Sequence, residues 1–238
     1  MNKGKLFLIP VTLGKSTNSS VLPDGVMECA RLLTHFIAEN AKSARAFLKS
    51  LPSSIPLQQL HICELNEHTG TEELSGSLTP LLSGTDVGLI SEAGCPAVAD
   101  PGANLVRLAH RYGITVEPLV GPSSILLALM GSGSQGQRFA FNGYLPVPEA
   151  ERIAAIRRLE KRSRDEDSAE LFIETPYRNP QLLDTLRATL APSTWLTVAC
   201  DLTLPTQSII SRPVVDWRGD SADYKKRPAI FVLHASRR

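Results

Sequence analysis

The stretch SEAGCPAVADPGANL, residues 91–105, carries two carboxylates in a turn rich in Gly and Pro. Glu92 comes just after the buried-looking strand that contains DVGLI, where an unpaired carboxylate would be costly. Asp100 precedes Pro101 and is a natural N-cap, and it is equally placed to act as a general base. A loop that leaves the carboxyl end of a strand is the usual ligand-binding place in an open α/β sheet, yet this one matches neither GxGxxG nor GxxxxGK[ST]. Ligand binding and simple helix capping both stay open for this loop.

A second group of reactive side chains lies in FIETPYRNP, residues 172–180. Glu174, Tyr177 and Arg178 place a carboxylate, a phenol and a guanidinium between a predicted strand and a predicted helix. The guanidinium can hold a phosphate or a carboxylate in forked geometry. A polar turn with a helix cap would also explain the stretch, but the density of reactive groups in a strand-end loop favours function.

Nucleotide-triphosphate and metal motifs are incomplete. Gly14-Lys15-Ser16 resembles the tail of a phosphate-binding loop, but the first glycine of that motif is absent. The four cysteines have no CxxC pairing and the five histidines no HExxH spacing. Reduced thiols and no metal site are therefore expected.

The densest positive region is ERIAAIRRLEKRSR, residues 151–164. Its apolar positions predict a helix with one buried face and its basic side chains on the exposed face. A solvated surface is the commoner explanation of such a run. It is also the surface we expect to meet phosphate, if this protein meets one. The basic side chains expected to be exposed are Arg152, Arg157, Arg158, Lys161, Arg162 and Arg164.

Short apolar runs with helical patterns between them must position these side chains. Strands are predicted at residues 5–12, 60–65, 86–91, 114–120, 139–146, 169–175, 195–202 and 229–234. Residues 26–51 have helical spacing, with a candidate strand hidden at 34–38. The alternation predicts an α/β fold with much parallel sheet, and residues 86–120 complete one βαβ unit.

We interpret the chain as two α/β lobes, residues 1–121 and 122–238, with a linker within about 118–136. The Gly/Ser stretch at 131–136 is the best linker candidate, and a cleft between the lobes is the expected small-molecule site. A formal net charge of +1 makes no global case for a polyanion partner. No apolar run is long enough to span a membrane, so a cytoplasmic protein is expected.

Seven segments follow one another in an order that covers nearly the whole chain: LFLIPVTLG, GLISEAGCPAVADPGANLV, PLVGPSSILLALMGSG, FNGYLP, FIETPYRNP, VACDLT and RPAIFVL. This ordered set resembles the tetrapyrrole methylase (class III) family of S-adenosylmethionine-dependent methyltransferases, most of all its branch of 16S rRNA cytidine 2′-O-ribose methyltransferases. The resemblance implies a homodimer with S-adenosyl-L-methionine in the cleft between two α/β lobes. The residues that it assigns to the cofactor are Pro10, Gly94, Cys95, Pro96, Val98, Ser123, Ser124, Ile125, Phe172, Glu174, Ala199, Cys200, Pro228 and Ala229.

The leading hypothesis is 2′-O-methylation of a ribose in small-subunit ribosomal RNA. The candidate catalytic residues are Glu92, Asp100, Glu174 and Arg178, because a ribose hydroxyl benefits from a nearby base. Substrate binding is assigned to Tyr177, Arg178, Arg157, Arg158 and Arg162. The sequence has ENAK at 39–42 and ACDLT at 199–203, where the rRNA branch carries EDTR and RELT. These departures concern the RNA substrate and not the methyltransferase activity, so methylation of a tetrapyrrole or another small molecule stays open. A non-catalytic S-adenosylmethionine-binding module is the further alternative.

Overall fold

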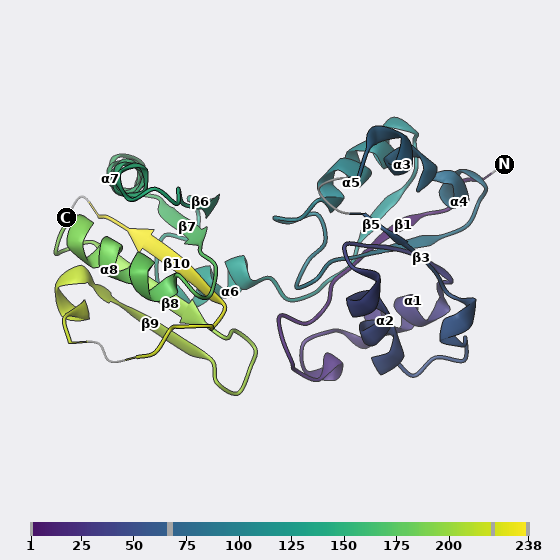
Figure 1. Ribbon diagram of the computed structural model, residues 1–238, viewed down its shortest axis with the longest axis horizontal. Helices are drawn as coiled ribbons and strands as arrows, with labels where there is room; N and C mark the ends of the chain where they lie inside the picture. The colour runs from purple at the N-terminus through teal and green to yellow at the C-terminus, as the bar shows by residue number, and fades with distance from the viewer. Residues whose placement is uncertain (1, 66–68, 220–221, 237–238) are drawn as a thin grey trace. The chain divides into compact units, whose positions relative to one another are not determined.

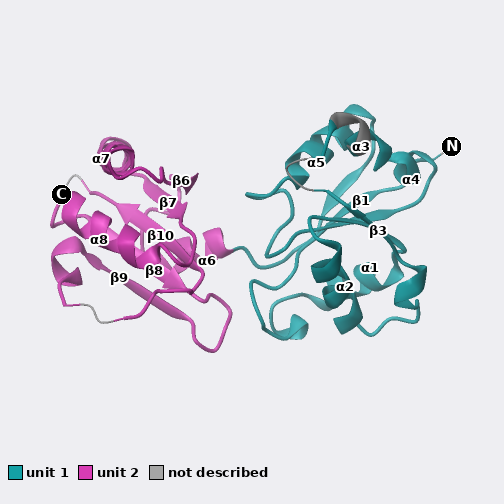
Figure 2. Ribbon diagram, in the orientation of Figure 1, with its two compact units in different colours: residues 1–123 teal, residues 124–238 magenta. Residues whose placement is uncertain are grey.

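The computed structural model describes residues 2–65, 69–219 and 222–236, with the backbone alone for 71–73. The chain divides into two compact units, a first unit of residues 1–123 and a second unit of residues 124–238 (Figure 2). The sequence had suggested lobes of residues 1–121 and 122–238. The Gly/Ser stretch at 131–136 lies inside the second unit, where a helix runs as far as Ser132.

The first unit is an α/β fold built on one parallel sheet. Its five strands are β1 (Leu6–Ile9), β2 (His35–Ala38), β3 (His61–Glu64), β4 (Val87–Ile90) and β5 (Val116–Pro118). They lie in the order β3-β2-β4-β1-β5. The α-helices are α1 (Asp24–Leu32), α2 (Ala41–Ser50), α3 (Thr71–Gly76), α4 (Thr79–Leu82) and α5 (Gly102–Arg111). Short 3-10 turns occupy Asn18–Ser20 and Leu57–Gln59.

Period-two alternation explains the layers of the first unit. Ile9 and Phe36 pack with α1 and α2 in one core, while Leu6 and Ile37 pack with α4 and α5 in another. Figure 1 accordingly shows α1 and α2 on one face of the sheet and α3, α4 and α5 on the other. A sheet covered on both faces buries its strands completely, and all four residues of β4 are buried.

Two local predictions for the first unit are confirmed. The hidden strand at 34–38 is β2, and residues 86–120 form a βαβ unit through β4, α5 and β5. In that unit β5 pairs with β1 and not with β4. The helix α5 begins at Gly102, so Asp100 lies just outside it, although its carboxylate still accepts from the Gly102 N–H at 2.8 Å.

The second unit is built on a mixed sheet. Its strands are β6 (Phe139–Tyr144), β7 (Ala169–Ile173), β8 (Trp195–Cys200), β9 (Ser208–Pro213) and β10 (Ala229–His234), in the order β6-β7-β10-β8-β9. Among the hydrogen-bonded pairs of this sheet, only β6 and β7 are parallel. β10 runs antiparallel to both β7 and β8, and β9 runs antiparallel to β8. The helices are α6 (Ser124–Ser132), α7 (Glu149–Glu166) and α8 (Asn179–Thr189), with a 3-10 turn at Val214–Trp217.

The core of the second unit lies between its sheet and the helices α7 and α8. Ile156 and Leu159 of α7 and Leu186 of α8 share one cluster with Phe172 and Phe231 of the sheet. The helix α6 packs against β8, β9 and β10. The strand β9 was not predicted, and the expected parallel sheet is found in the first unit and only in the β6–β7 pair of the second.

Candidate functional site

The carboxyl ends of β1, β4 and β5 meet at one edge of the first sheet. β1 is hydrogen-bonded to both β4 and β5, and all three strands are parallel. This edge is where ligands bind in open α/β sheets. The loops that leave it begin at Pro10, Ser91 and Leu119.

Backbone contacts hold the first two loops together. The Val11 N–H donates to the Gly94 carbonyl at 3.0 Å, and the Ser91 hydroxyl donates to the same carbonyl at 3.2 Å. Gly94 has φ of +72°, a conformation that glycine adopts without steric cost. The structure therefore brings Pro10 and the Gly94-Cys95-Pro96 turn to the same place.

The third loop closes on the first at Gly121. A Cβ atom on Gly121 would lie 2.2 Å from the Pro10 Cγ atom, so only glycine fits against that ring. The Cys95 thiol lies 3.4 Å from the Pro122 carbonyl, and burial raises its pKa above the ordinary thiol value. Gly121 was missed as a site residue, although a Gly-Pro pair after a strand was a signal for it. Pro10, the Gly94-Cys95-Pro96 turn and Gly121 thus bring three loops together through uncharged residues.

Asp100 holds the shape of the 91–105 loop. Its Oδ1 atom accepts from the Ala97 N–H and the Gly102 N–H, both at 2.8 Å. These bonds support Ala97 and Ala99, which have φ of +64° and +58°. Burial raises the pKa of the Asp100 carboxyl, while its two backbone hydrogen bonds act in the opposite direction. Both bonds go to backbone N–H groups of its own turn and of the start of α5, so the geometry favours capping over catalysis.

The strand before Glu92 is buried as predicted, but Glu92 itself is exposed, so its carboxylate does not bear the expected cost of burial. One of its oxygens accepts from the Ser43 hydroxyl of α2 at 2.5 Å. Its carboxylate lines a cavity of about 1080 Å³ within the first unit. Among the three candidate carboxylates, Glu92 is the one on the wall of this cavity, because Asp100 and Glu174 do not line it.

In the second unit, strand register gathers the residues assigned to the cofactor. Antiparallel pairing places Ala229 opposite Cys200 and Ile230 opposite Ala199, and Ile173, the residue before Glu174, also pairs with Ile230. The Asp201 N–H then donates to the Pro228 carbonyl at 3.0 Å. The carboxyl ends of β7 and β8 and the amino end of β10 thus form one edge of this sheet.

Two of these residues belong to the core through their side chains. Phe172 is fully buried and stacks on Phe231 with ring centroids 5.8 Å apart. Cys200 is also fully buried, and burial raises the pKa of its thiol to about 11. Neither of these side chains is exposed to a ligand, and both residues belong to the core of the second unit. Ser124 and Ile125 are the first two residues of α6.

Glu174 and Arg178 neutralise each other. A carboxylate oxygen of Glu174 accepts from the Arg178 Nη2 and from the Thr175 N–H, both at 2.6 Å. The Glu174 side chain is almost completely buried. Tyr177, in contrast, is 68% exposed, with the Lys226 ammonium 5.9 Å from its ring centroid. Glu174 and Arg178 therefore form a structural pair, and Tyr177 is accessible.

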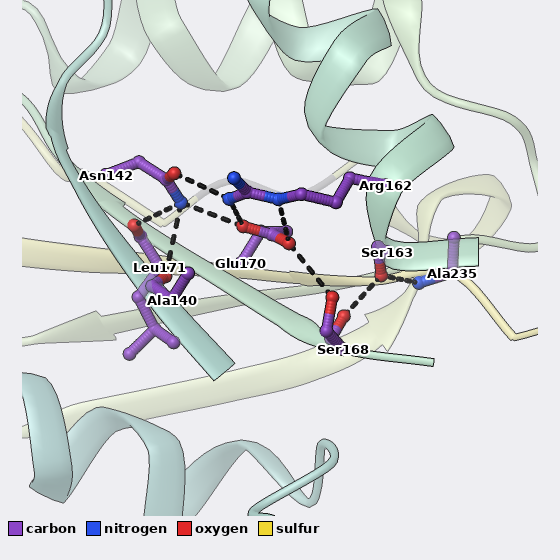
Figure 3. A network of polar contacts seen from close by, with 8 residues as sticks. All are labelled: Ala140, Asn142, Arg162, Ser163, Ser168, Glu170, Leu171 and Ala235. Atoms are coloured by element: carbon purple, nitrogen blue, oxygen red, sulfur yellow. Dashed lines mark hydrogen bonds and ion pairs between the residues drawn. The ribbon is translucent and has the colours of Figure 1, made fainter. Parts of the chain in front are cut away.

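The basic helix α7 differs from its predicted form at two arginines. Arg157 and Arg158 are exposed as expected. Arg152 is 4% exposed and its Nη1 donates to the Val147 carbonyl at 2.7 Å, so its predicted exposure was wrong. Arg162 pairs with the buried Glu170 (Figure 3).

The Arg162 contact belongs to a buried network. Its Nε donates to Glu170 at 2.7 Å and its Nη2 to the Asn142 side-chain oxygen at 2.7 Å. Asn142 and Ser168 also donate to the Glu170 carboxylate, at 2.9 and 3.0 Å. Figure 3 shows the guanidinium turned toward Glu170 and Asn142. The arginine therefore has a clear structural task.

The described part of the chain contains neither a metal site nor a membrane-spanning helix. No group of His, Cys, Asp and Glu there has the arrangement of a metal site. No helix in the described ranges is long and apolar enough to cross a membrane.

Known proteins resemble this chain over nearly its whole length, although no family model matches it. The ribosomal RNA small subunit methyltransferase I of Xylella fastidiosa (strain Temecula1) is 30% identical over 231 residues, which are 97% of this chain and 80% of the relative. The protein of the same name from Escherichia coli O157:H7 is 26% identical over 235 residues, 98% of this chain and 78% of the relative. The crystal structure of the methyltransferase CobJ matches with a TM-score of 0.64 at 17% identity, covering 98% of this chain and 94% of CobJ, which supports the fold alone. The predicted α/β fold class is confirmed.

Proposed function

The chain belongs to the ribosomal RNA small subunit methyltransferase I family, and we propose that it methylates a ribose 2′-hydroxyl of small-subunit ribosomal RNA with S-adenosyl-L-methionine as methyl donor. The observation that carries the proposal is the 30% identity that extends over 97% of the chain. The tetrapyrrole alternative is less favoured, since the curated relatives described above are named for ribosomal RNA and the likeness to CobJ supports only the fold.

The residues at the edge of the first sheet fit such a cofactor. The S-adenosylmethionine sulfonium supplies an electrophilic methyl group. Pro10, Gly94, Cys95 and Pro96 are uncharged, and no fixed cation among them would repel a sulfonium. We propose that they hold the cofactor largely through backbone groups. Cofactor binding by the residues of the second unit stays a prediction. The cleft between the lobes and the homodimer also stay predictions.

The two cysteines assigned to the cofactor are protected from methylation. A thiolate is the reactive form of cysteine, and an electrophilic methyl group would alkylate it. Burial raises the pKa of Cys95 and brings that of Cys200 to about 11. Both side chains are therefore neutral thiols near pH 7, which is compatible with a bound methyl donor.

Glu92 is the proposed general base. Its second carboxylate oxygen has no hydrogen-bond partner among the described residues, and the carboxylate lines the 1080 Å³ cavity. Glu92 would take the proton of a ribose hydroxyl that donates to that oxygen. The ribose oxygen would bond to the methyl carbon as the methyl–sulfur bond of the donor breaks, with the electron pair staying on sulfur. Ser43 donates to the other oxygen and fixes the carboxylate's direction. Asp100 and Glu174 are assigned the structural roles described above.

Phosphate contacts on α7 are proposed for Arg157 and Arg158, which are exposed and have no ion-pair partner in the part of the chain that the structure describes. Arg162 is left out because its guanidinium holds Glu170. Tyr177 is retained as an accessible ring that can stack on an unpaired base.

The function is tested with small ribosomal subunits from cells that lack this gene. The purified protein should transfer tritiated methyl from S-adenosylmethionine to their RNA, and mass spectrometry should place the label on a ribose. Tight cofactor binding without labelled RNA would refute the proposal and favour the non-catalytic module. Labelling of a tetrapyrrole in place of RNA would favour the other alternative.

Glu92→Gln tests the base in the same assay. The methyl transfer rate should fall by roughly 10²–10⁴-fold, because the amide cannot take a proton. S-adenosylmethionine affinity should stay unchanged. Glu28→Gln, which removes an exposed carboxylate of α1 outside the cavity, is the matched control. Equal rates for both variants would exclude Glu92 as the base.

A further inference from the structure

Several residues besides Glu92 and Ser43 line the 1080 Å³ cavity. It is lined by the loop after β1, the helices α1 and α2, and the carboxyl end of β4, all within the first unit. Its volume of about 1080 Å³ is slightly above that of ordinary small-ligand sites. Phe47, Leu51 and Pro52 give it an apolar surface, and Lys15 and Arg31 give it two cations. The Gly14-Lys15-Ser16 sequence, which matched no complete nucleotide motif, is thus part of a cavity wall.

The two cations are available for an anion. Lys15 is exposed, and Arg31 is half-buried in the last turn of α1. Neither forms an ion pair with a carboxylate among the described residues. The helix dipole accounts for a cation at the end of α1, but it does not require the side chain to face a cavity.

Two buried donors of this wall lack partners. The Arg31 Nε and the Ser16 hydroxyl oxygen are both inaccessible and have no hydrogen-bond partner in the described part of the chain. Such groups are rare in native proteins because each one costs the free energy of its desolvation. Arg31 also borders a second cavity of about 230 Å³, whereas Ser16 lines only the larger one. Each of these donors lacks an acceptor, which an anion with several oxygens could supply.

A phosphate group has the required chemistry. It offers acceptor oxygens to the Arg31 guanidinium and the Ser16 hydroxyl, and it carries the negative charge that Lys15 and Arg31 would neutralise. The apolar surface at Phe47 suits the base or ribose of an unstacked nucleotide. Glu92, on the same cavity, is the acceptor for a ribose hydroxyl.

We propose that this cavity holds one nucleotide of the RNA substrate, with Lys15, Arg31 and Ser16 binding a backbone phosphate beside the ribose that faces Glu92. The inference rests on the proposed function and deepens it, because it places the substrate's phosphate in the first unit. It also gives Gly14-Lys15-Ser16 a phosphate-binding task that involves no nucleotide triphosphate.

Direct RNA binding tests the proposal without relying on methyl transfer. Protein loaded with S-adenosylhomocysteine is titrated with small-subunit RNA from the deletion strain at several salt concentrations. Arg31→Gln should weaken binding roughly tenfold, and each of Arg31→Gln and Lys15→Gln should reduce the salt slope by about one. Arg111→Gln is the matched control, since Arg111 is an exposed cation of α5 that does not line this cavity. Lys15 is exposed, so its variant keeps the test decisive even if Arg31→Gln is unstable.

The possible results separate this proposal from the function on which it rests. Unchanged affinity and salt slope in Lys15→Gln and Arg31→Gln, with RNA binding by the parent protein, would overturn the phosphate site alone. Absence of RNA binding by the parent protein would overturn both. Arg31→Lys should recover part of the affinity because it keeps the charge, whereas loss of cofactor affinity in parallel with RNA affinity would indicate a structural role for Arg31 and count against the proposal.

Discussion

Replacing Arg162 by methionine separates its structural task from RNA binding. The Glu170 side chain is completely buried, while the Arg162 side chain is 37% exposed. Arg162→Met keeps the length of the stem but removes the charge that compensates a buried carboxylate. Breaking a buried pair costs about 3–5 kcal/mol, and partial solvent screening here reduces our expectation to about 2–3 kcal/mol.

The assay is urea unfolding followed by circular dichroism, with a thermal scan beside it. The expected loss corresponds to a melting temperature lower by roughly 10 °C for a unit of this size. The control Arg158→Met removes an exposed arginine from the same helix and should change the unfolding free energy by less than about 0.5 kcal/mol. Glu170→Gln in the Arg162→Met background should restore at least about 1 kcal/mol, because Asn142 and Ser168 can still bond a neutral amide.

RNA affinity completes the test. Arg158→Met should weaken RNA binding and reduce its salt slope, whereas Arg162→Met, measured where it is folded, should leave both near the parent values. If Arg162→Met is as stable as Arg158→Met and binds RNA more weakly, the buried-network reasoning is refuted. Arg162 would then be the phosphate ligand that its sequence position suggested.

Two further predictions concern the loops of the first unit. Gly121→Ala should lower the unfolding free energy by about 1–3 kcal/mol, because the new Cβ would overlap the Pro10 ring. The variant should also bind S-adenosylmethionine more weakly in calorimetry. Gly25→Ala is the control, since a Cβ at Gly25 would meet nothing within 4 Å. Asp100→Ala should lose about 1–2 kcal/mol with its two backbone bonds. Asp100→Asn keeps a side-chain oxygen that can accept the two backbone hydrogen bonds. Because burial raises the pKa of the Asp100 carboxyl, the parent protein loses stability as the pH rises through that pKa. The asparagine variant should therefore be the more stable at pH 7, with the gap closing toward acid pH in urea titrations, and a less stable asparagine variant at pH 7 would contradict this.

Local patterns determined most of the elements. The short apolar run at 87–90 predicted a strand. All four residues are buried because helices cover both faces of the sheet. Pro101 and Gly113 bracket the helix α5 within one or two residues. The strand β9 was missed because all six of its residues are only half-buried, and such a segment has little apolar signal.

The sequence predicted site residues within single loops, but it did not predict which loops contact each other. The order of segments implicated Pro10 and Gly94 separately, but the pairing of β1 with β4 decided that Val11 bonds Gly94. The antiparallel register of β8 and β10 likewise decided that Cys200 lies beside Ala229.

By itself the sequence determined the α/β class, the strand-end loops and the family resemblance, because these depend on residue types and on spacing within a few residues. The tertiary structure alone decided which charges are free. Arg157 and Arg162 are equivalent basic residues of one helix in the sequence, yet only Arg162 meets a buried carboxylate from the neighbouring strand. Glu92 and Glu174 both follow strands, yet only Glu174 is buried against an arginine. Such pairings depend on chain segments brought together by folding, and no local pattern encodes them.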